Sequence, residues 1–289
     1  MKAPRFDYVR VTSVADAAAQ LRQHGDDARL LAGGQSLLAT LNMRLSQPTV
    51  LLDITGIKEL HGISVEHGYL RLGALVRHVE IERSELVAKC LPLLTQAAPH
   101  LAHPAIRNRG TFGGSVALAD PSAEWPACTL AADGELVLSD GSNERRVMAG
   151  DFFIDLYQTD LRPGELVTAV EFPLPGPQRR FAFAELARRH GDYAIVGIAI
   201  AADVVGGVLD EMRIVFLGVG NTPMRALGAE TALNGTRGEL AALKEAIGSL
   251  REDIAPSNDL YTSAETKSHL AGVLLQRAVK LLLNQGEPS

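Results

Sequence analysis

Two short stretches of this sequence carry the residue types that suit binding of a phosphate group. The first is AGGQSL at residues 32–37, which follows the apolar run ARLLA, and the second is TFGGS at residues 111–115. Each holds two adjacent glycines beside small hydroxyl or amide side chains. A turn from strand to helix at such glycines leaves backbone N–H groups unpaired and has no Cβ atom to block a ligand. The first stretch equally fits a plain tight turn with a serine cap.

Two such loops in one domain could hold a pyrophosphate from both sides, which is the group that a dinucleotide offers. Asp120 and Glu124 follow the second loop and are of the type that accepts hydrogen bonds from ribityl or ribose hydroxyls. They equally fit a helix N-terminal acid and a surface acid. Arg107 and Arg109 fit either a phosphate contact or a structural or partner-facing role. We keep both alternatives open for each pair.

Other nucleotide-binding and catalytic patterns are not found in the sequence. Neither GxGxxG nor GxxxxGK[ST] occurs, and GVGNTP at residues 218–223 carries Pro223 where a third small residue is needed, which favours a plain turn. We identify no nucleophile or acid–base constellation and predict no catalytic residue in this chain. Cys90 and Cys128 are isolated, which excludes a CxxC metal site, so we predict no metal site and interpret both as buried thiols.

Short strands and helices alternate through about residue 172, which indicates α+β or α/β architecture. Ser13 can cap a helix that Gly25 ends, and His67-Gly68 is typical of a hairpin turn. Proline and glycine concentrate in FPLPGPQRR at residues 172–180, where we place a domain boundary. We expect strands over 28–32, 49–54, 181–189, 194–205 and 211–220, and helices over 13–24, 36–45, 226–248 and 264–284.

Composition limits the possible function classes. The chain has 289 residues, of which 46% are hydrophobic and 21% charged, as in ordinary globular proteins. Its net charge of −6 and lack of a basic stripe argue against a nucleic-acid partner. No run approaches the ~20 apolar residues that span a bilayer, and the N-terminus lacks the apolar core of a signal peptide. We therefore expect a cytoplasmic protein.

Three stretches in this order resemble a known family: AGGQSLL, HPAIRNRGTFGGSVALADPSAEWPA and ARRHGDYAIVG. They are similar to the flavoprotein (medium) subunit of molybdenum hydroxylases of the carbon monoxide dehydrogenase type and to the FAD domain of xanthine dehydrogenases. GNTPMRALGAETALNG, DIAPSNDL and the last helix extend the likeness over nearly the whole chain.

The resemblance implies the fold and its domains. It implies an α+β, two-lobed FAD-binding domain of the vanillyl-alcohol-oxidase (PCMH) type over residues 1–175, with two subdomains split near residue 55. Residues 176–289 then form a small C-terminal domain with a three-stranded antiparallel sheet and helices.

The resemblance also implies the cofactor site. The two glycine loops would hold the FAD pyrophosphate, and Asp120 and Glu124 the ribityl and adenosine portions. Ile106 would lie against the isoalloxazine and Tyr193 would guard its exposed face, although Tyr193 also fits an ordinary strand aromatic. The implied cofactor-binding residues are Ala32, Gly33, Gly34, Gln35, Ser36, Leu37, Ile106, Thr111, Gly113, Gly114, Ser115, Asp120, Glu124, Val167 and Tyr193.

The function that the resemblance implies is electron transfer within a complex. Electrons would pass from two [2Fe–2S] clusters on a small subunit to FAD here, and then to an external acceptor such as quinone, NAD or oxygen. The large subunit would carry molybdopterin, and the assembly would be a heterotrimer, doubled into a dimer of heterotrimers. Two alternatives stay open: a self-standing flavin oxidoreductase, with His103, His190 and Tyr193 as its only candidate polar groups, and a subunit without redox function.

Two departures from the family pattern carry predictions. Gln35 stands where many relatives have histidine, so it cannot form a histidyl bond to a flavin, and we predict non-covalent FAD. The segment YTSAETKSHL lacks the Tyr-Arg pair usual in SAxYR, which would affect contacts with a partner subunit.

Overall fold

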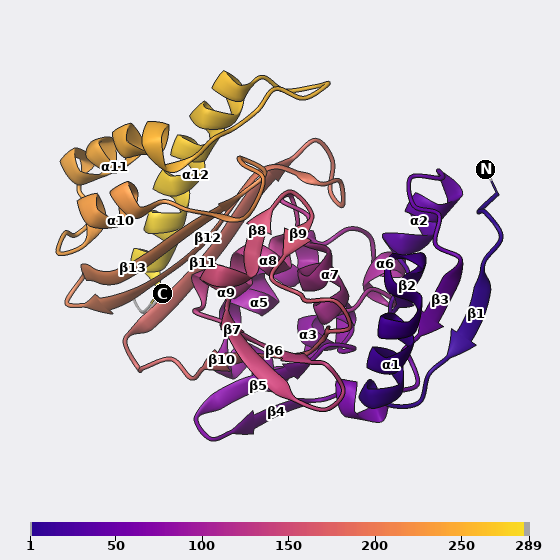
Figure 1. The fold of residues 1–289 in the computed structure, drawn as a ribbon. Coiled ribbons are helices and arrows are strands. Elements are labelled where there is room, and N and C mark those ends of the chain that lie inside the picture. The colour runs from indigo at the N-terminus through magenta and orange to yellow at the C-terminus, as the bar shows by residue number, and fades with distance from the viewer. Residues whose placement is uncertain (1, 286–289) are drawn as a thin grey trace.

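The computed structural model describes residues 2–285 and confirms the mixed helix and sheet architecture (Figure 1). The strands are β1 (Asp7–Arg10), β2 (Ala28–Leu31), β3 (Val50–Asp53), β4 (Ile63–Glu66), β5 (Tyr69–Gly73), β6 (Glu135–Ser139), β7 (Glu144–Met148), β8 (Phe153–Asp155), β9 (Gln158–Thr159), β10 (Leu166–Pro173), β11 (Arg179–Ala187), β12 (Ala194–Val205), β13 (Val208–Leu217) and β14 (Met224–Arg225). The helices are α1 (Val14–His24), α2 (Leu37–Asn42), α3 (His78–Arg83), α4 (Glu85–Cys90), α5 (Pro92–Ala97), α6 (Pro104–Arg107), α7 (Phe112–Leu118), α8 (Glu124–Ala131), α9 (Ala149–Phe152), α10 (Leu227–Leu233), α11 (Leu240–Asp253) and α12 (Ala264–Asn284).

The N-terminal layer is a parallel sheet in the order β1-β3-β2, with α1 and α2 as its crossover helices (Figure 1). Helix α1 begins and ends as predicted: Ser13 Oγ accepts a hydrogen bond from the backbone N–H of Asp16 at 3.1 Å, and Gly25 follows the last turn with φ 53°. Helix α2 is shorter than predicted, because Arg44 turns the chain with φ 58°. This layer places the loop of residues 32–37 at the end of β2.

The central part is an antiparallel sheet in the order β4-β5-β10-β6-β7, covered by α3 to α9. The predicted hairpin at residues 67–68 is the turn between β4 and β5, and both residues have positive φ. Phe112, Trp125, Phe152 and Phe172 are the largest side chains of its core, and all are fully buried. This part presents residues 111–115 at the start of α7, Asp120 before α8, and Glu124 as the first residue of α8.

The C-terminal part contains the three long antiparallel strands that we expected, β11 to β13, and the two-residue strand β14 at the edge beside β13. The single helix expected over 226–248 is wrong: α10 and α11 are separate, because Gly235 and Gly238 adopt positive φ between them. One face of this sheet packs into the central core, and the other packs against α10, α11 and α12.

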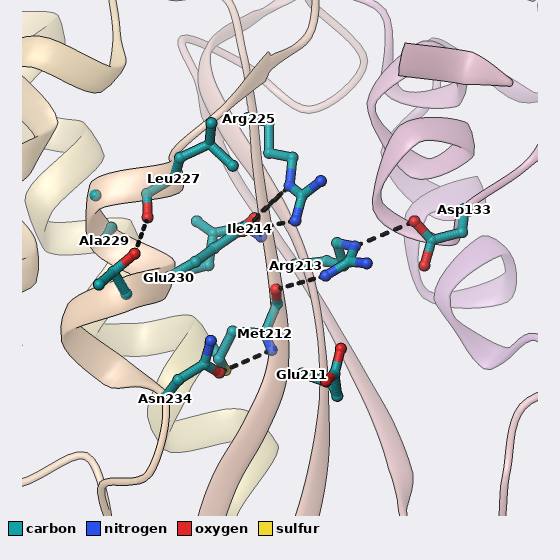
Figure 2. Close-up of polar contacts among 12 residues, drawn as sticks. Asp133, Glu211, Met212, Arg213, Ile214, Arg225, Leu227, Ala229, Glu230 and Asn234 are labelled. Carbon is teal, nitrogen blue, oxygen red and sulfur yellow. Dashed lines mark hydrogen bonds and ion pairs between the residues drawn. The ribbon is translucent and has the colours of Figure 1, made fainter.

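Polar contacts hold the C-terminal sheet to α10 and to the central part (Figure 2). Glu230 on α10 is 4% exposed; its Oε1 accepts a hydrogen bond from the backbone N–H of Ile214 at 2.8 Å, and Arg225 pairs with it at 2.8 Å. Arg213 of β13 donates to Asp133, just after α8, at 3.1 Å. Strand β13 is therefore bonded both to α10 and to the central part. Across the described chain, we find no helix that combines the length and the apolar character needed to cross a membrane.

Candidate functional site

The two glycine loops lie directly against each other. A Cβ atom added to Gly33 would lie 2.4 Å from the carbonyl oxygen of Arg109 and 2.7 Å from the Cα of Gly110, which immediately precedes the second loop. A Cβ added to Gly114 would lie 3.8 Å from the Cβ of Ala32. The structure therefore brings together the two stretches that the sequence singles out. Gly33 is required because any side chain there would collide with backbone.

These loops present backbone donors. The backbone N–H groups of residues 33–37 and of Gly114 donate no hydrogen bond to any residue that the structure describes. Ser36 sits at the N-cap position of α2 in a helical conformation without a side-chain capping bond, so it does not act as the serine cap. Helices α2 and α7 have six and seven residues, so individual N–H groups, more than a macrodipole, make this site suit an anion.

The hydroxyl of Thr111 is buried without a partner. Thr111 is 6% exposed, and its Oγ1 makes no hydrogen bond within residues 2–285. It lies 2.7 Å from the position that a Cβ of Gly114 would take, so it faces the second glycine. Buried hydroxyls almost always have partners. A phosphate oxygen would supply one, so the residues present fit the pyrophosphate that a dinucleotide such as FAD carries.

The second loop packs against helices α3 and α8. The backbone N–H of Gly113 donates to the carbonyl of Ala74 at 2.9 Å, and Gly110 leaves no room for a Cβ against His78. His78 Nδ1 accepts a hydrogen bond from Trp125 Nε1 at 2.9 Å. Burial, with a smaller effect of the Arg107 cation, lowers the pKa of His78 to about 4 and keeps the imidazole neutral. The loop is thus fixed by packing between α3 and α8.

The two arginines before the second loop differ in role. Arg107 is 7% exposed, donates to the carbonyls of Leu101 and Ala102 at 3.0 and 2.9 Å, and pairs with Glu82 at 3.0 Å. Its donors hold the turn that leads into α6, which makes it structural. Arg109 is exposed. The sequence alone does not distinguish them.

An acidic and aromatic cluster follows the second loop. Asp120 accepts hydrogen bonds from the backbone N–H of Ser122 at 2.9 Å and from Tyr157 Oη at 3.3 Å. Glu124 is 8% exposed, so it is not a surface acid. Burial, then the Glu185 carboxylate, raises the pKa of Glu124 to about 8, with a further contribution from Asp120.

Two tyrosines belong to this cluster. Partial desolvation and the charge of Asp120 raise the pKa of Tyr157 to about 12 and also raise that of the largely exposed Tyr193. The sequence analysis did not select Tyr157. It lies in the turn between β8 and β9, and nothing in its neighbours signals that this turn reaches Asp120.

The remaining candidates lie around these loops. Ile106 is half-buried on α6, and its carbonyl accepts a hydrogen bond from the backbone N–H of Gly110 at 2.7 Å. Val167 is buried in the central core, in the same hydrophobic cluster as Phe112 of the second loop. The carbonyl of the neighbouring Thr168 accepts a hydrogen bond from the backbone N–H of Ala74, which supports that loop. GVGNTP forms a turn after β13, where the backbone N–H of Gly218 donates to the carbonyl of Pro121 at 2.8 Å.

Comparison with known proteins identifies related chains. Residues 4–175 match the family described as FAD binding domain in molybdopterin dehydrogenase, and residues 181–282 match the CO dehydrogenase flavoprotein C-terminal domain. The chain is 36% identical to caffeine dehydrogenase subunit beta of Pseudomonas sp. (strain CBB1), covering 96% of this chain and 95% of the relative. It is 35% identical to the carbon monoxide dehydrogenase medium chain of Hydrogenophaga pseudoflava, covering 96% of each. Reconstituted CO dehydrogenase from Oligotropha carboxidovorans contains a chain of similar structure, with a TM-score of 0.96, 35% identity, and coverage of 99% and 100%.

Proposed function

This chain belongs to the medium, FAD-binding flavoprotein subunits of the molybdenum hydroxylase family, and from that membership we propose that it transfers electrons between partner subunits and an external acceptor. Bound to the chain, FAD would supply the redox chemistry, taking electrons from the partner's [2Fe–2S] clusters and passing them to a quinone, NAD or oxygen. The chain's own residues bind and orient the cofactor and shape its electrostatic surroundings.

The observation that carries the proposal is the contact between the two glycine loops. We assign the pyrophosphate to the free N–H groups of residues 33–37 and Gly114 and to the Thr111 hydroxyl. Ala32, Gln35, Leu37, Gly113 and Ser115 complete these loops. Beyond them, we assign the ribityl and adenosine groups to Asp120 and Glu124, and the isoalloxazine to Ile106 and Tyr193. Val167 is a further cofactor-binding residue of the proposal. Gln35 Nε2 donates a hydrogen bond to the carbonyl of Gly33 at 3.2 Å, which supports a role for Gln35 in shaping the turn. Because glutamine cannot form a histidyl bond to a flavin, we propose that FAD is held without a covalent bond.

The assembly is the second part of the proposal. The carbon monoxide dehydrogenase relatives are named as medium chains, which supports a complex with a large molybdopterin subunit and a small [2Fe–2S] subunit, doubled into a dimer of heterotrimers. We place the complex in the cytoplasm, where the free thiols of Cys90 and Cys128 suit a reducing compartment. We divide the chain at residues 175 and 176, and the first part near residue 55, as the separate sheets favour.

Gly33→Ala tests the cofactor site. The added methyl group has no space against Arg109 and Gly110, so the loops must separate, and we expect FAD affinity to fall by a factor of about 10 or more, equivalent to ~1.4 kcal/mol. The measurement is calorimetric titration of cofactor-free protein with FAD. Gly176→Ala is the matched control, because a Cβ there meets nothing within 4 Å. Equal affinity in both variants would refute the loop assignment.

Purification from the native source tests the assembly. A flavin spectrum together with iron, molybdenum and two further chains is the expected result. A yellow, metal-free protein that oxidises a small molecule by itself would replace the proposal with a self-standing flavoenzyme.

A further inference from the structure

The loop between β11 and β12 contacts the C-terminal segment of the chain. This β11–β12 loop comprises residues 188–193, and the pairing of Ala187 with Ala194 fixes its two ends. Cζ of the Arg188 guanidinium lies 4.4 Å from the centre of the Tyr261 ring, which is a cation–π contact. Tyr261 opens the segment YTSAETKSHL, which lacks the Tyr-Arg pair usual in SAxYR. In this chain, the tyrosine of that segment pairs with an arginine of a distant loop.

The same loop packs against the turn before α6. Gly191 has φ 87°, and a Cβ atom added there would lie 2.6 Å from Cε1 of His103 and 3.2 Å from the carbonyl carbon of Ala102. The two segments therefore touch at a position that has no room for a side chain. His103 is the N-cap residue of α6, the helix that carries Ile106. The β11–β12 loop thus contacts both the C-terminal segment and a helix of the proposed cofactor site.

The last residue of the loop is Tyr193, which we assign to the isoalloxazine. The strand that follows it is fixed beside the acidic cluster. A Cβ atom added to Gly218 would lie 2.6 Å from the carbonyl oxygen of Ile195, and the backbone N–H of Gly218 donates to the carbonyl of Pro121, next to Asp120, at 2.8 Å. Tyr193 itself is 67% exposed, so its neighbours hold it only in part. Its orientation therefore depends on the rest of the β11–β12 loop.

Tyr261 is held in its turn by a residue of α12. Asp259 Oδ1 accepts hydrogen bonds from the backbone N–H groups of Tyr261 and Thr262 at 2.7 and 2.8 Å. Asp259 Oδ2 pairs at 2.9 Å with Nζ of Lys267, which is 7% exposed on α12. Lys267 keeps this ion pair, because an unpaired cation at a buried position is costly. The ring of Tyr261 is therefore presented to Arg188 from a fixed turn.

We propose that Tyr261 is a positioning residue for the flavin: it holds Arg188, and through the β11–β12 loop it keeps Tyr193 at the place where we assign the isoalloxazine. The C-terminal part of the chain thereby controls how closely an external acceptor approaches the flavin. The contact between Tyr261 and Arg188 is a property of the chain by itself, whereas its effect on the flavin rests on the proposed function.

Trypsin cleavage of the folded, full-length protein tests the contact. Trypsin cleaves after Arg188 only when this guanidinium enters the S1 pocket of the protease, so the Tyr261 ring must first release it. We expect Tyr261→Ala to raise the cleavage rate after Arg188 by about 2- to 5-fold, which corresponds to the strength of an exposed cation–π contact. Tyr261→Phe is the matched control, because it keeps the ring face and should be cleaved at the wild-type rate.

A second cleavage site serves as the internal standard. Arg237 is exposed in the turn after α10, and its cleavage rate should be the same in all three proteins. Equal rates after Arg188 in the wild type and in Tyr261→Ala overturn the contact. An equal rise after Arg188 and after Arg237 does so too, because it shows general destabilisation of the protein. Mass spectrometry of the fragments measures each rate separately.

Quenching of flavin fluorescence by iodide tests the link to the cofactor in the FAD-loaded protein. Iodide quenches by collision, so its quenching constant measures how exposed the flavin is. We expect this constant to rise in Tyr193→Ala, to rise by no more than that in Tyr261→Ala, and to keep the wild-type value in Tyr261→Phe. The double variant should match Tyr193→Ala alone, because Tyr261 acts through Tyr193. Additive effects in the double variant, or no effect of Tyr261→Ala, overturn the positioning role.

The two proposals fail in different ways. A protein that never binds FAD, but whose cleavage after Arg188 depends on Tyr261, refutes the proposed function and the flavin part of this inference and leaves the contact standing. A flavin-loaded protein in which Tyr261→Ala changes neither cleavage nor quenching refutes this inference and leaves the proposed function standing.

Discussion

The hydroxyl group of Thr111 lowers the stability of the cofactor-free protein but, in our proposal, raises its affinity for FAD. Without a ligand, Oγ1 is buried without a partner, which costs about 1–3 kcal/mol. We therefore expect Thr111→Val, which keeps the shape, to leave the cofactor-free protein equally stable or more stable, while FAD affinity falls about 5- to 10-fold. Thermal unfolding and calorimetric titration measure the two effects. Thr12→Val, on an exposed threonine, is the control, and a destabilised Thr111→Val protein with unchanged FAD affinity would contradict the assignment.

Some residues of the candidate site can be predicted from the sequence, and others cannot. The glycine loops were predictable because only glycine permits such close backbone approach, and that requirement is local. Tyr157 was not predicted, since it reaches Asp120 from a turn that is distant in the sequence. Arg107 and Arg109 have the same local context, and only burial separates a structural guanidinium from an exposed one.

The short segment from α6 into the second loop depends on Arg107. We expect Arg107→Met to destabilise the protein by about 3 kcal/mol, because the carbonyls of Leu101 and Ala102 lose their donor and Glu82 loses its cation. Arg109→Met, two residues away and exposed, should change stability by less than ~0.5 kcal/mol. Urea unfolding of both variants measures the difference, and equal values for the two would show that Arg107 does not hold this segment.

Element boundaries were predictable where chain-local chemistry sets them. Ser13 and Gly25 bound α1, and β12 spans the predicted residues 194–205. The helix break between α10 and α11 was missed although the sequence signals it: Asn234-Gly235 and Gly238 are typical turn residues, and both glycines adopt positive φ. The pairing order β1-β3-β2 and the edge strand β14 also depend on distant partners, which no local pattern specifies.

For the molecule as a whole, two buried titratable groups limit stability from opposite sides of the pH scale. The folded-state pKa of Glu124 rises from 4.5 to about 8, so the stability that it contributes is fully present below pH 4.5 and is lost as the pH rises through 8. The folded-state pKa of His78 falls from 6.5 to about 4, so its contribution is present above pH 6.5 and is lost as the pH falls through 4.

These shifts predict a stability maximum of the cofactor-free protein between about pH 4.5 and 6.5. Denaturant unfolding from about pH 4 to pH 8 measures the profile on both sides of this maximum. Glu124→Gln should remove most of the decline on the alkaline side, whereas Glu144→Gln should follow the wild type. A decline that Glu124→Gln leaves intact would assign it to other groups.

The position of the C-terminal sheet affects when the chain can fold during its synthesis. The face of this sheet that packs against the central part completes the hydrophobic core around Phe112 and Trp125. Val215 and Leu217 of β13 belong to that core. A nascent chain that has emerged from the ribosome only through β10 has both glycine loops but an open core beneath them. Folding of residues 1–173 therefore waits for translation of β13, and a chain truncated before that strand is a target for chaperones and proteases.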